Sequence, residues 1–195
     1  MIMKQKHLDC VMPAAGLSSR MGDWKLMLPY RQHTILDESI ENALHFCSRV
    51  IVVAGHRHEE LVKHCCRHDN VLVVINPHYQ QGMFSSIQVG VEHVESEHFF
   101  ICHGDMPCVP ADIYQQVWAL KGRCTVFPGT LNKPGHPVLL PKNMIDIIKN
   151  APITSKMKPL IMAHTVKYLG LKCDEIYLDI DTPDAYQSLI KTQQS

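Results

Sequence analysis

The chain has 195 residues, which is enough for one α/β domain with a sizeable buried core. Its 19 basic and 19 acidic residues balance, so no strong overall charge would draw it to nucleic acid or to an anionic membrane. No apolar run approaches the roughly 20 residues of a membrane span, and the N-terminus lacks the apolar core of a signal peptide. We therefore expect neither a nucleic acid nor a membrane as partner.

Apolar segments alternate with amphipathic segments along the chain. In chain order they predict a strand over residues 8–13, a helix over 35–46, a strand over 49–54, a helix over 59–66, a strand over 71–75, a helix over 83–94, a strand over 98–103, a helix over 112–120 and a strand over 125–127. The remainder predicts a strand over 138–140, helices over 144–149 and 160–164, a strand over 175–178 and a last helix from Thr182-Pro183 onward. Thr34, with Asp37 three residues later, comes close to a capping box for the first helix.

This alternation is typical of the α/β class, with a mostly parallel central sheet and helices on both faces. No linker or repeat divides the chain, so we expect a single domain over residues 1–195. Ligands of such sheets bind beyond the carboxyl ends of the strands. The loops after Pro13, Ile75 and His103 should therefore converge on one crevice.

Cysteines and histidines are numerous, but their spacing is not that of a metal site. The eight cysteines form no CxxC pair, which favours reduced, mostly buried thiols in a cytoplasmic protein. His64 and His68 flank Cys65 and Cys66 on a predicted helix, without the further spaced ligands that zinc requires. We expect solvated histidines and one inward-facing cysteine there.

The loop after the first predicted strand, in PAAGLSSRMGDWK, is suited to an anion. Glycines free backbone N–H groups at a strand-to-helix turn, and Arg20 and Lys25 add positive charge. The loop is neither a P-loop, since no Gly-Lys-Ser/Thr follows, nor a GxGxxG turn. Taken alone, it is equally typical of an ordinary surface turn.

This segment resembles the signature of the MobA-like nucleotidyltransferases, the family of molybdenum cofactor cytidylyltransferases and guanylyltransferases. Four further blocks follow in the family's order: NPHYQQGMFSSI, HGDMP, PGHPVLL and DIDTPDAY. The resemblance implies one MobA-like NTP transferase domain with a Rossmann-like fold. The residues that match the signature are Ala15, Gly16, Ser18, Arg20, Met21, Gly22, Lys25, Leu28 and Pro29.

Family members join a nucleoside triphosphate to a phosphorylated acceptor and release pyrophosphate, so the protein must bring negative charges together. The resemblance implies that Lys25 and Arg20 neutralise the triphosphate, beside a loop that includes Ser18, Ser19 and Gly22. No side-chain general base is required, because a phosphate monoester with a second pKa near 6 is largely ionised at neutral pH.

The resemblance also implies a magnesium site. Asp105 directly follows the strand of HFFICHGD, and Mg²⁺ prefers carboxylates, phosphate oxygens and water. Asp181, in LDIDTP, is the implied second ligand. Asp179 would share a strand face with it and stays an alternative. Asp181 could instead cap the last helix.

Two blocks bear on the choice of base. Pro13-Ala14-Ala15-Gly16 has the form that accompanies cytosine use in the family, whereas Leu-Ala-Gly-Gly accompanies guanine. The block from Gly82 to Ser86 (GMFSS) resembles Gly-Leu-Leu-Thr-Ser of cytidylyltransferases, not Gly-Pro-Leu-Ala-Gly. The Ala15 methyl would narrow the pocket, and Ser85 or Ser86 would bond the base. Simple N-capping of the helix is the alternative role for both serines.

The acceptor side is less defined. His136, in PGHPVLL, lies in the block that resembles the family's acceptor segment, although a Pro-Gly turn leading into a strand explains it equally well. Residues 154–158 (TSKMK) lack the Gly-Asp run of some relatives.

The resemblance implies Mg²⁺-dependent transfer of CMP from CTP to the molybdenum–molybdopterin cofactor, giving molybdopterin cytosine dinucleotide and pyrophosphate. Guanylyl transfer to the same cofactor, or cytidylyl transfer to a sugar or polyol phosphate, would use the same machinery. A non-catalytic cofactor-delivery protein is disfavoured by the presence of Lys25, Asp105 and Asp181. A transient contact with an apo-molybdoenzyme is compatible with each of these functions.

Overall fold

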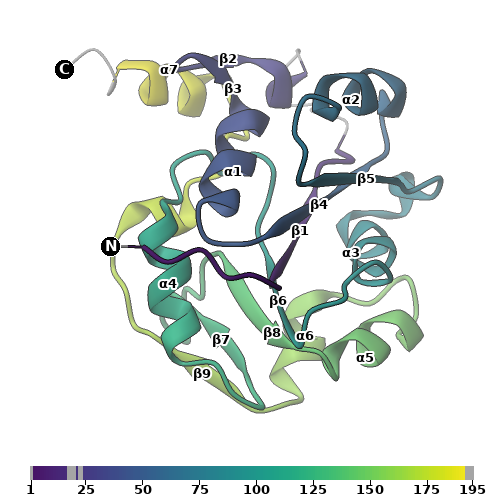
Figure 1. The fold of residues 1–195 in the computed structure, drawn as a ribbon, viewed down its shortest axis with the longest axis vertical. Coiled ribbons are helices and arrows are strands. Elements are labelled where there is room, and N and C mark those ends of the chain that lie inside the picture. The colour runs from purple at the N-terminus through teal and green to yellow at the C-terminus, as the bar shows by residue number, and fades with distance from the viewer. Residues whose placement is uncertain (1, 17–20, 22–23, 192–195) are drawn as a thin grey trace.

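The computed structural model describes residues 2–16, 21 and 24–191, and its α/β architecture confirms the predicted fold class (Figure 1). Within these residues the central sheet has seven strands, in the order β5-β4-β1-β6-β8-β7-β9. Strands β5, β4, β1 and β6 are parallel, β8 is antiparallel to both β6 and β7, and β9 is parallel to β7. Their bounds are β1 Asp9–Pro13, β4 Arg49–Ala54, β5 Val71–Ile75, β6 His98–Ile101, β7 Thr125–Phe127, β8 Val138–Pro141 and β9 Val166–Tyr168.

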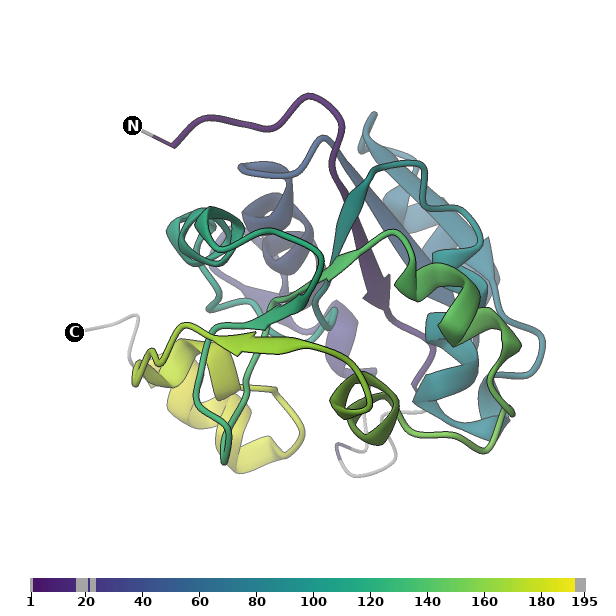
Figure 2. The ribbon, with the colours of Figure 1, turned by 90° about the horizontal axis from the view of Figure 1, so that it is seen from below.

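Helices cover both faces of this sheet, as Figure 2 shows from below. The first face carries α1 (Ile35–Leu44), α2 (His58–Cys65) and α4 (Ala111–Ala119), whose apolar side chains pack in one core cluster. The opposite face carries α3 (Met83–Val91), α5 (Met144–Asn150) and α6 (Met157–Met162), packed in a second cluster.

The strand sequences explain this division. Successive side chains of a strand point to opposite faces, so Cys10 and Met12 of β1 join the first cluster while Val11 joins the second. The parallel strands are apolar on both faces, as expected for a sheet buried between helices. Gly90 lets α3 approach β1 closely, since a Cβ there would lie 2.4 Å from Val11 Cγ1.

Smaller elements complete the fold. The hairpin of β2 (Pro29–Tyr30) and β3 (His33–Thr34) lies beside α7 (Pro183–Lys191) in Figure 1, and Tyr186 Oη donates to Pro29 O at 2.8 Å. Short 3₁₀ turns occur at η1 (Lys25–Met27), η2 (Tyr79–Gln81) and η3 (Asp174–Tyr177). No helix in the described part of the chain is long and apolar enough to cross a membrane.

Local predictions were mostly confirmed. The capping box forms, because Thr34 Oγ1 accepts from Asp37 N at 3.2 Å and Asp37 Oδ2 accepts from Thr34 N at 3.0 Å. The strand predicted over residues 175–178 is wrong, since η3 occupies that segment. The reason is that β9, which the sequence analysis missed, already pairs with the free edge of β7.

Candidate active site

A polar pocket of about 440 Å³ lies at the carboxyl ends of the parallel strands. It is bordered by segments that follow β1, β5 and β6, so the predicted convergence of these loops is confirmed. We call it the polar pocket. Its described lining residues are Pro13, Ala14, Ala15, Gly16, Met21, Lys25, Leu26, Tyr79, Gln80, Gly82, Met83, Ser86, His103, Asp105, Asp179 and Asp181.

One lysine joins two carboxylates in this pocket. Lys25 Nζ lies 2.5 Å from Asp105 Oδ2 and 2.6 Å from Asp181 Oδ1. Burial of the Lys25 ammonium would lower its pKa, but the charge of Asp105 and the hydrogen bonds to both carboxylates outweigh burial and raise it. Lys25 therefore carries its positive charge at neutral pH.

The backbone brings these carboxylates together across 76 residues of sequence. Ile180 N donates to Asp105 O at 3.0 Å, and the Ile180 side chain is buried among Tyr30, Ile35 and Leu189. Thr182, rather than Asp181, occupies the capping position of α7, because Thr182 Oγ1 accepts from Ala185 N at 3.2 Å. The helix-capping alternative for Asp181 is therefore wrong.

Two carboxylate oxygens can bind a divalent cation whose remaining ligands come from the substrate and from water. Asp105 Oδ1 is buried and has no hydrogen-bond partner among the described residues, while Asp181 Oδ1 accepts from the same lysine ammonium as Asp105 Oδ2. Within those same residues no cluster of three or more His, Cys, Asp or Glu side chains forms a closed metal site. Asp179 lines the same pocket and is exposed, so the choice between the two C-terminal aspartates favours Asp181 by its contacts.

The N-terminal wall of the pocket is tightly packed at the predicted base-selecting block. Ala14 and Ala15 are buried, and a Cβ on Gly55 would lie 2.7 Å from Ala15 Cβ and 2.5 Å from Tyr79 Cβ. Ala15 therefore cannot move away from the pocket without displacing Gly55 or Tyr79. The predicted phosphate-loop residues Ser18, Ser19, Arg20 and Gly22 lie outside the described residues.

The second base-selecting block begins at Gly82, whose φ of +101° favours glycine. Neither serine caps α3, whose N-cap is Gly82 without a side-chain bond, so the capping alternative is wrong. Instead Asn76 Nδ2 donates to Ser85 Oγ at 2.8 Å and to Ser86 Oγ at 3.0 Å. Ser86 lines the polar pocket, whereas Ser85 lies behind it and donates to Gly82 O at 2.7 Å.

Asn76 is a residue that sequence reasoning missed. It is buried, directly follows β5, and its side chain fixes both serine hydroxyls. The signal was available, since Asn76 opens the NPHYQQGMFSSI block.

A second pocket of about 570 Å³, which we call the apolar pocket, adjoins the polar pocket and shares Gly82, Met83 and His103 with it. Its remaining lining residues are Gln81, Phe84, Ile87, Ile101, Phe127, Pro134, Gly135, His136, Val138, Ile153, Thr154, Ser155, Lys156, Met157, Lys158 and Ile161.

The sequence candidate His136 lies in this second pocket. Its backbone N–H donates to Ile176 O at 2.8 Å, so η3 fixes the Gly135-His136 turn, in which Gly135 has a φ of +70°. The His136 ring lies 4.2 Å from the His103 ring, measured between centroids. Burial lowers the pKa of both imidazoles, and most strongly that of His136. Both rings are therefore mainly neutral at pH 7.

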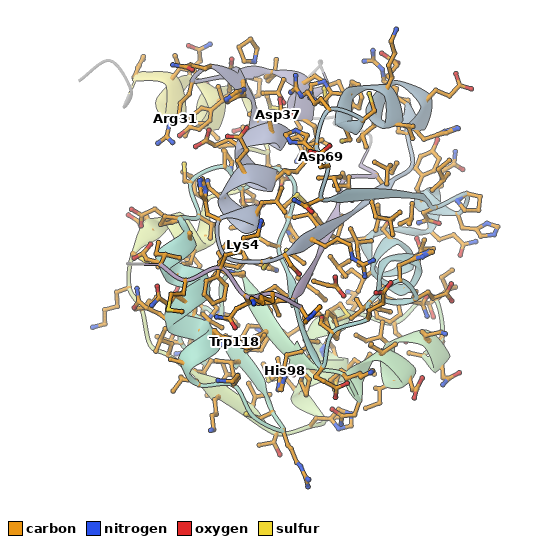
Figure 3. All side chains as sticks on the ribbon, in the orientation of Figure 1. Lys4, Arg31, Asp37, Asp69, His98 and Trp118 are labelled. Atoms are coloured by element: carbon orange, nitrogen blue, oxygen red, sulfur yellow. The ribbon has the colours of Figure 1, made fainter. Side chains whose placement is uncertain are left out.

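A further polar cluster lies outside both pockets, around Asp37 of α1, which Figure 3 labels. His64 Nε2 and His68 Nε2 lie 2.9 Å and 3.2 Å from Asp37 Oδ1, and Arg67 also pairs with this buried carboxylate. The expectation of solvated histidines is wrong here, because the capping aspartate binds them. Cys65 is buried as expected.

Comparisons with known proteins agree with this geometry. The MobA-like NTP transferase domain model matches residues 10–168. The chain is 43% identical over 180 residues to the molybdenum cofactor cytidylyltransferase of Escherichia coli, covering 92% of this chain and 93% of the relative. It is 24% identical over 197 residues to a probable molybdenum cofactor guanylyltransferase of Carboxydothermus hydrogenoformans, covering 95% and 96%.

Solved structures share the fold. A Mycobacterium sp. strain JC1 homologue of a Mycobacterium tuberculosis protein superposes with a TM-score of 0.79 at 24% identity, covering 95% of this chain and 96% of the other. Molybdopterin-guanine dinucleotide biosynthesis protein A from Archaeoglobus fulgidus gives 0.73 at 15% identity, covering 95% and 98%. The M. tuberculosis protein in complex with manganese gives 0.75 at 22%, with the same coverage. Since the family model spans most of the chain, the predicted family is confirmed, and the chain belongs to the MobA-like NTP transferases.

Proposed function

We propose that this protein transfers CMP from CTP to the molybdenum–molybdopterin cofactor, with Mg²⁺ held by Asp105 and Asp181. The observation that carries the proposal is the Lys25–Asp105–Asp181 centre in a polar pocket that adjoins an apolar pocket. The similarity to the E. coli cytidylyltransferase supports the choice of substrates.

The polar pocket takes the nucleotide in this proposal. Lys25 contributes a fixed positive charge for the triphosphate, and the loop residues Ser18, Ser19, Arg20 and Gly22 are the further candidates for binding the phosphates. A Cβ added to Gly16, just before this loop, would meet no described atom within 4 Å. Asp105 and Asp181 would hold Mg²⁺, which when bound supplies positive charge to the α-phosphate and the leaving pyrophosphate.

The cytosine base contacts the two selecting blocks. One wall of the base site is formed by Pro13, Ala14 and Ala15. Gly55 and Tyr79 pack behind this wall and prevent it from moving outward, which disfavours binding of the larger purine base. The Ser86 hydroxyl is oriented by Asn76 and offers a hydrogen bond to the smaller base. Ser85 acts through the Gly82 turn that it fixes.

The apolar pocket takes the acceptor. Phe127, Ile161 and other apolar side chains suit a flat pterin, while the exposed Lys156 and Lys158 at its outer wall attract the anionic cofactor. His136 contacts the acceptor near the shared boundary. An oxygen of the acceptor phosphate attacks the α-phosphorus, the bond to the bridging oxygen of the β-phosphate breaks, and pyrophosphate leaves with the electron pair.

We also propose that the reaction takes place in the cytoplasm, where the eight free cysteines would stay reduced and an apo-molybdoenzyme could receive the product.

The test is a pyrophosphate-release assay with CTP, GTP, ATP and UTP, each with and without the molybdenum cofactor. We expect release with CTP only when cofactor and Mg²⁺ are both present, and its loss on chelation. Preferred use of GTP would support the guanylyl alternative. Turnover with a sugar or polyol phosphate but not with the cofactor would support the second alternative. Tight cofactor binding without release from any nucleotide would indicate a delivery protein.

A further inference from the structure

The two pockets meet at His103. Three residues of the described chain line both pockets. Gly82 has no side chain and Met83 has an apolar one, so among these three only His103 offers ring nitrogens. In the sequence, His103 marks only the predicted end of a strand.

The backbone holds His103 at this boundary. It lies two residues beyond Ile101, the last residue of β6, where Cys102 N donates to Val11 O at 3.1 Å and Gly104 N donates to Pro13 O at 3.3 Å. The residues on both sides of His103 are thus hydrogen-bonded to the backbone of β1, at Val11 and at Pro13. The imidazole projects from a rigid strand end, which suits a group that must orient a substrate.

The surroundings of the ring differ on its two sides. Toward the polar pocket, the charges of Lys25, Asp105, Asp179 and Asp181 act on it. Toward the apolar pocket, the His136 ring packs at 4.2 Å between centroids, tilted by 43°. Among the described residues neither imidazole forms a side-chain hydrogen bond, so an N–H donor of each can serve a ligand.

The other cations of the two pockets are less suited to this position. Lys25 is held between two carboxylates. Lys156 and Lys158 are exposed, line only the apolar pocket, and can attract an anion without fixing its orientation. The imidazole of His103, packed against that of His136, is therefore the polar group best placed where the two pockets meet.

We propose that His103, packed against His136, donates an N–H hydrogen bond to a non-attacking oxygen of the acceptor phosphate and so aligns that phosphate with the α-phosphorus of the nucleotide. This inference rests on the proposed nucleotidyl transfer and assigns it a substrate-orienting residue. In the step, a P–O bond forms from the acceptor oxygen to the α-phosphorus and the α–β bridging P–O bond breaks. The His103 proton stays on the ring, so the imidazole contributes position and not proton transfer.

The decisive variant is His103→Phe, which retains a ring against His136 and removes the donor. We expect the KM for the acceptor to rise and kcat to fall, together costing about tenfold or more in kcat/KM, as for a lost hydrogen bond to a charged group. The KM for CTP should change by less than about threefold, because His103 makes no contact with the nucleotide in this proposal. His103→Leu serves as a second apolar variant should the phenylalanine fit poorly.

Rescue identifies the donating nitrogen. Asn places its amide near the position of Nδ1 and Gln near that of Nε2, so one of His103→Asn and His103→Gln should recover acceptor KM relative to His103→Phe. The matched control is His98→Asn, at the first residue of β6, the strand that precedes His103. The His98 imidazole hydrogen-bonds Gly122 O at 2.9 Å and lies outside both pockets. This control should leave both KM values unchanged, even if it lowers the melting temperature.

Wild-type acceptor kinetics in a folded His103→Phe protein would overturn the inference, as would an equal loss for CTP and acceptor or a failure of both amides to restore acceptor use. A wild-type protein that forms no cytidylyl product would instead overturn the proposed function itself. The two failures are thus separable in one experiment.

Discussion

Asp105 is the residue whose environment best matches a bound cation. One carboxylate oxygen bonds Lys25, and the other is buried with no partner among the described residues. We expect Asp105→Asn to reduce turnover by two or more orders of magnitude, because charge stabilisation by a catalytic metal is worth about several kcal/mol. Steady-state pyrophosphate release measures this, with Asp184→Asn on the exposed first turn of α7 as control. Near-normal turnover in the folded Asp105 variant would remove the metal assignment.

Lys25 should act on the nucleotide rather than on the acceptor. Lys25→Met keeps the length of the side chain and removes the charge that the two carboxylates hold in the polar pocket. We expect kcat/KM for CTP to fall about 10- to 100-fold, the range for a lost charge-assisted hydrogen bond, with a smaller change in the acceptor KM. Varying each substrate in turn tests this, and the exposed Lys63→Met is the control. An unchanged CTP dependence would contradict the role.

The junction of α1 and α2 depends on a buried carboxylate (Figure 3). Burial would raise the pKa of Asp37, but hydrogen bonds from Arg67, Thr34 and His68 outweigh burial and hold it well below the ordinary value of 3.8. A lowered folded-state pKa means that the stabilising contribution is complete above the unfolded pKa and is lost as the pH falls below about 3.8.

We therefore expect Asp37→Asn to lower the free energy of unfolding at neutral pH, and the difference from wild type to shrink as the pH falls from about 4 toward 2. Urea unfolding at several pH values measures it, with the exposed Asp69→Asn as control. A difference that stays constant down to pH 2 would mean that the charge of Asp37 does not stabilise this junction.

In the proposed function, base choice depends on two elements acting together: the end of β1 with its following residues, and the start of α3. Replacing 13–16 with Leu-Ala-Gly-Gly alone, or 82–86 with Gly-Pro-Leu-Ala-Gly alone, should impair CTP use without giving efficient GTP use. The reason is that Asn76 orients Ser85 and Ser86 in one block while the packed Ala15 wall excludes the larger base in the other. Replacing both should shift the ratio of kcat/KM for CTP and GTP toward GTP. A wild-type preference for GTP, or an unchanged ratio after the double replacement, would show that these blocks do not select the base.

The same elements show what a sequence can predict. The alternation of strands and helices follows from local periodicity, and the capping box of Thr34 and Asp37 from three consecutive positions. The η3 segment was predicted as a strand, but a strand forms only where a partner strand has a free edge. The free edge of β7 is already paired with β9, which lies about 40 residues after β7 in the sequence. The role proposed for His103 depends on which distant loops meet, so its local sequence alone could not reveal it. Asn76 opens a block that the sequence singled out, but its bonds to Ser85 and Ser86 depend on how that block folds.

At the scale of the whole molecule, the charged centre is assembled from both ends of the chain. Lys25 follows β1, Asp105 follows β6, and Asp181 precedes α7, which packs beside the β2–β3 hairpin (Figure 1). The sheet fixes Asp105, while the bond from Ile180 N to Asp105 O ties the C-terminal segment to it. A ligand that engages all three side chains would therefore bind the folded protein and not the unfolded chain.

Because such a ligand binds only the native state, the thermal stability of the protein reports whether the site is occupied. A ligand at about 100 times its Kd stabilises the native state by ~2.7 kcal/mol, which for a chain of this size raises Tm by about 5–10 °C. We expect CTP with Mg²⁺ to produce a rise of this order, and CTP or Mg²⁺ alone a much smaller one, because the carboxylates and the triphosphate each complete the shell of the cation. Asp105→Asn should abolish the joint effect, whereas Asp184→Asn, three residues beyond Asp181 and outside the polar pocket, should keep it. Thermal unfolding with each addition measures this without requiring the acceptor. A rise that CTP alone produces in full, or that survives Asp105→Asn, would place the nucleotide elsewhere than on the Lys25–Asp105–Asp181 centre.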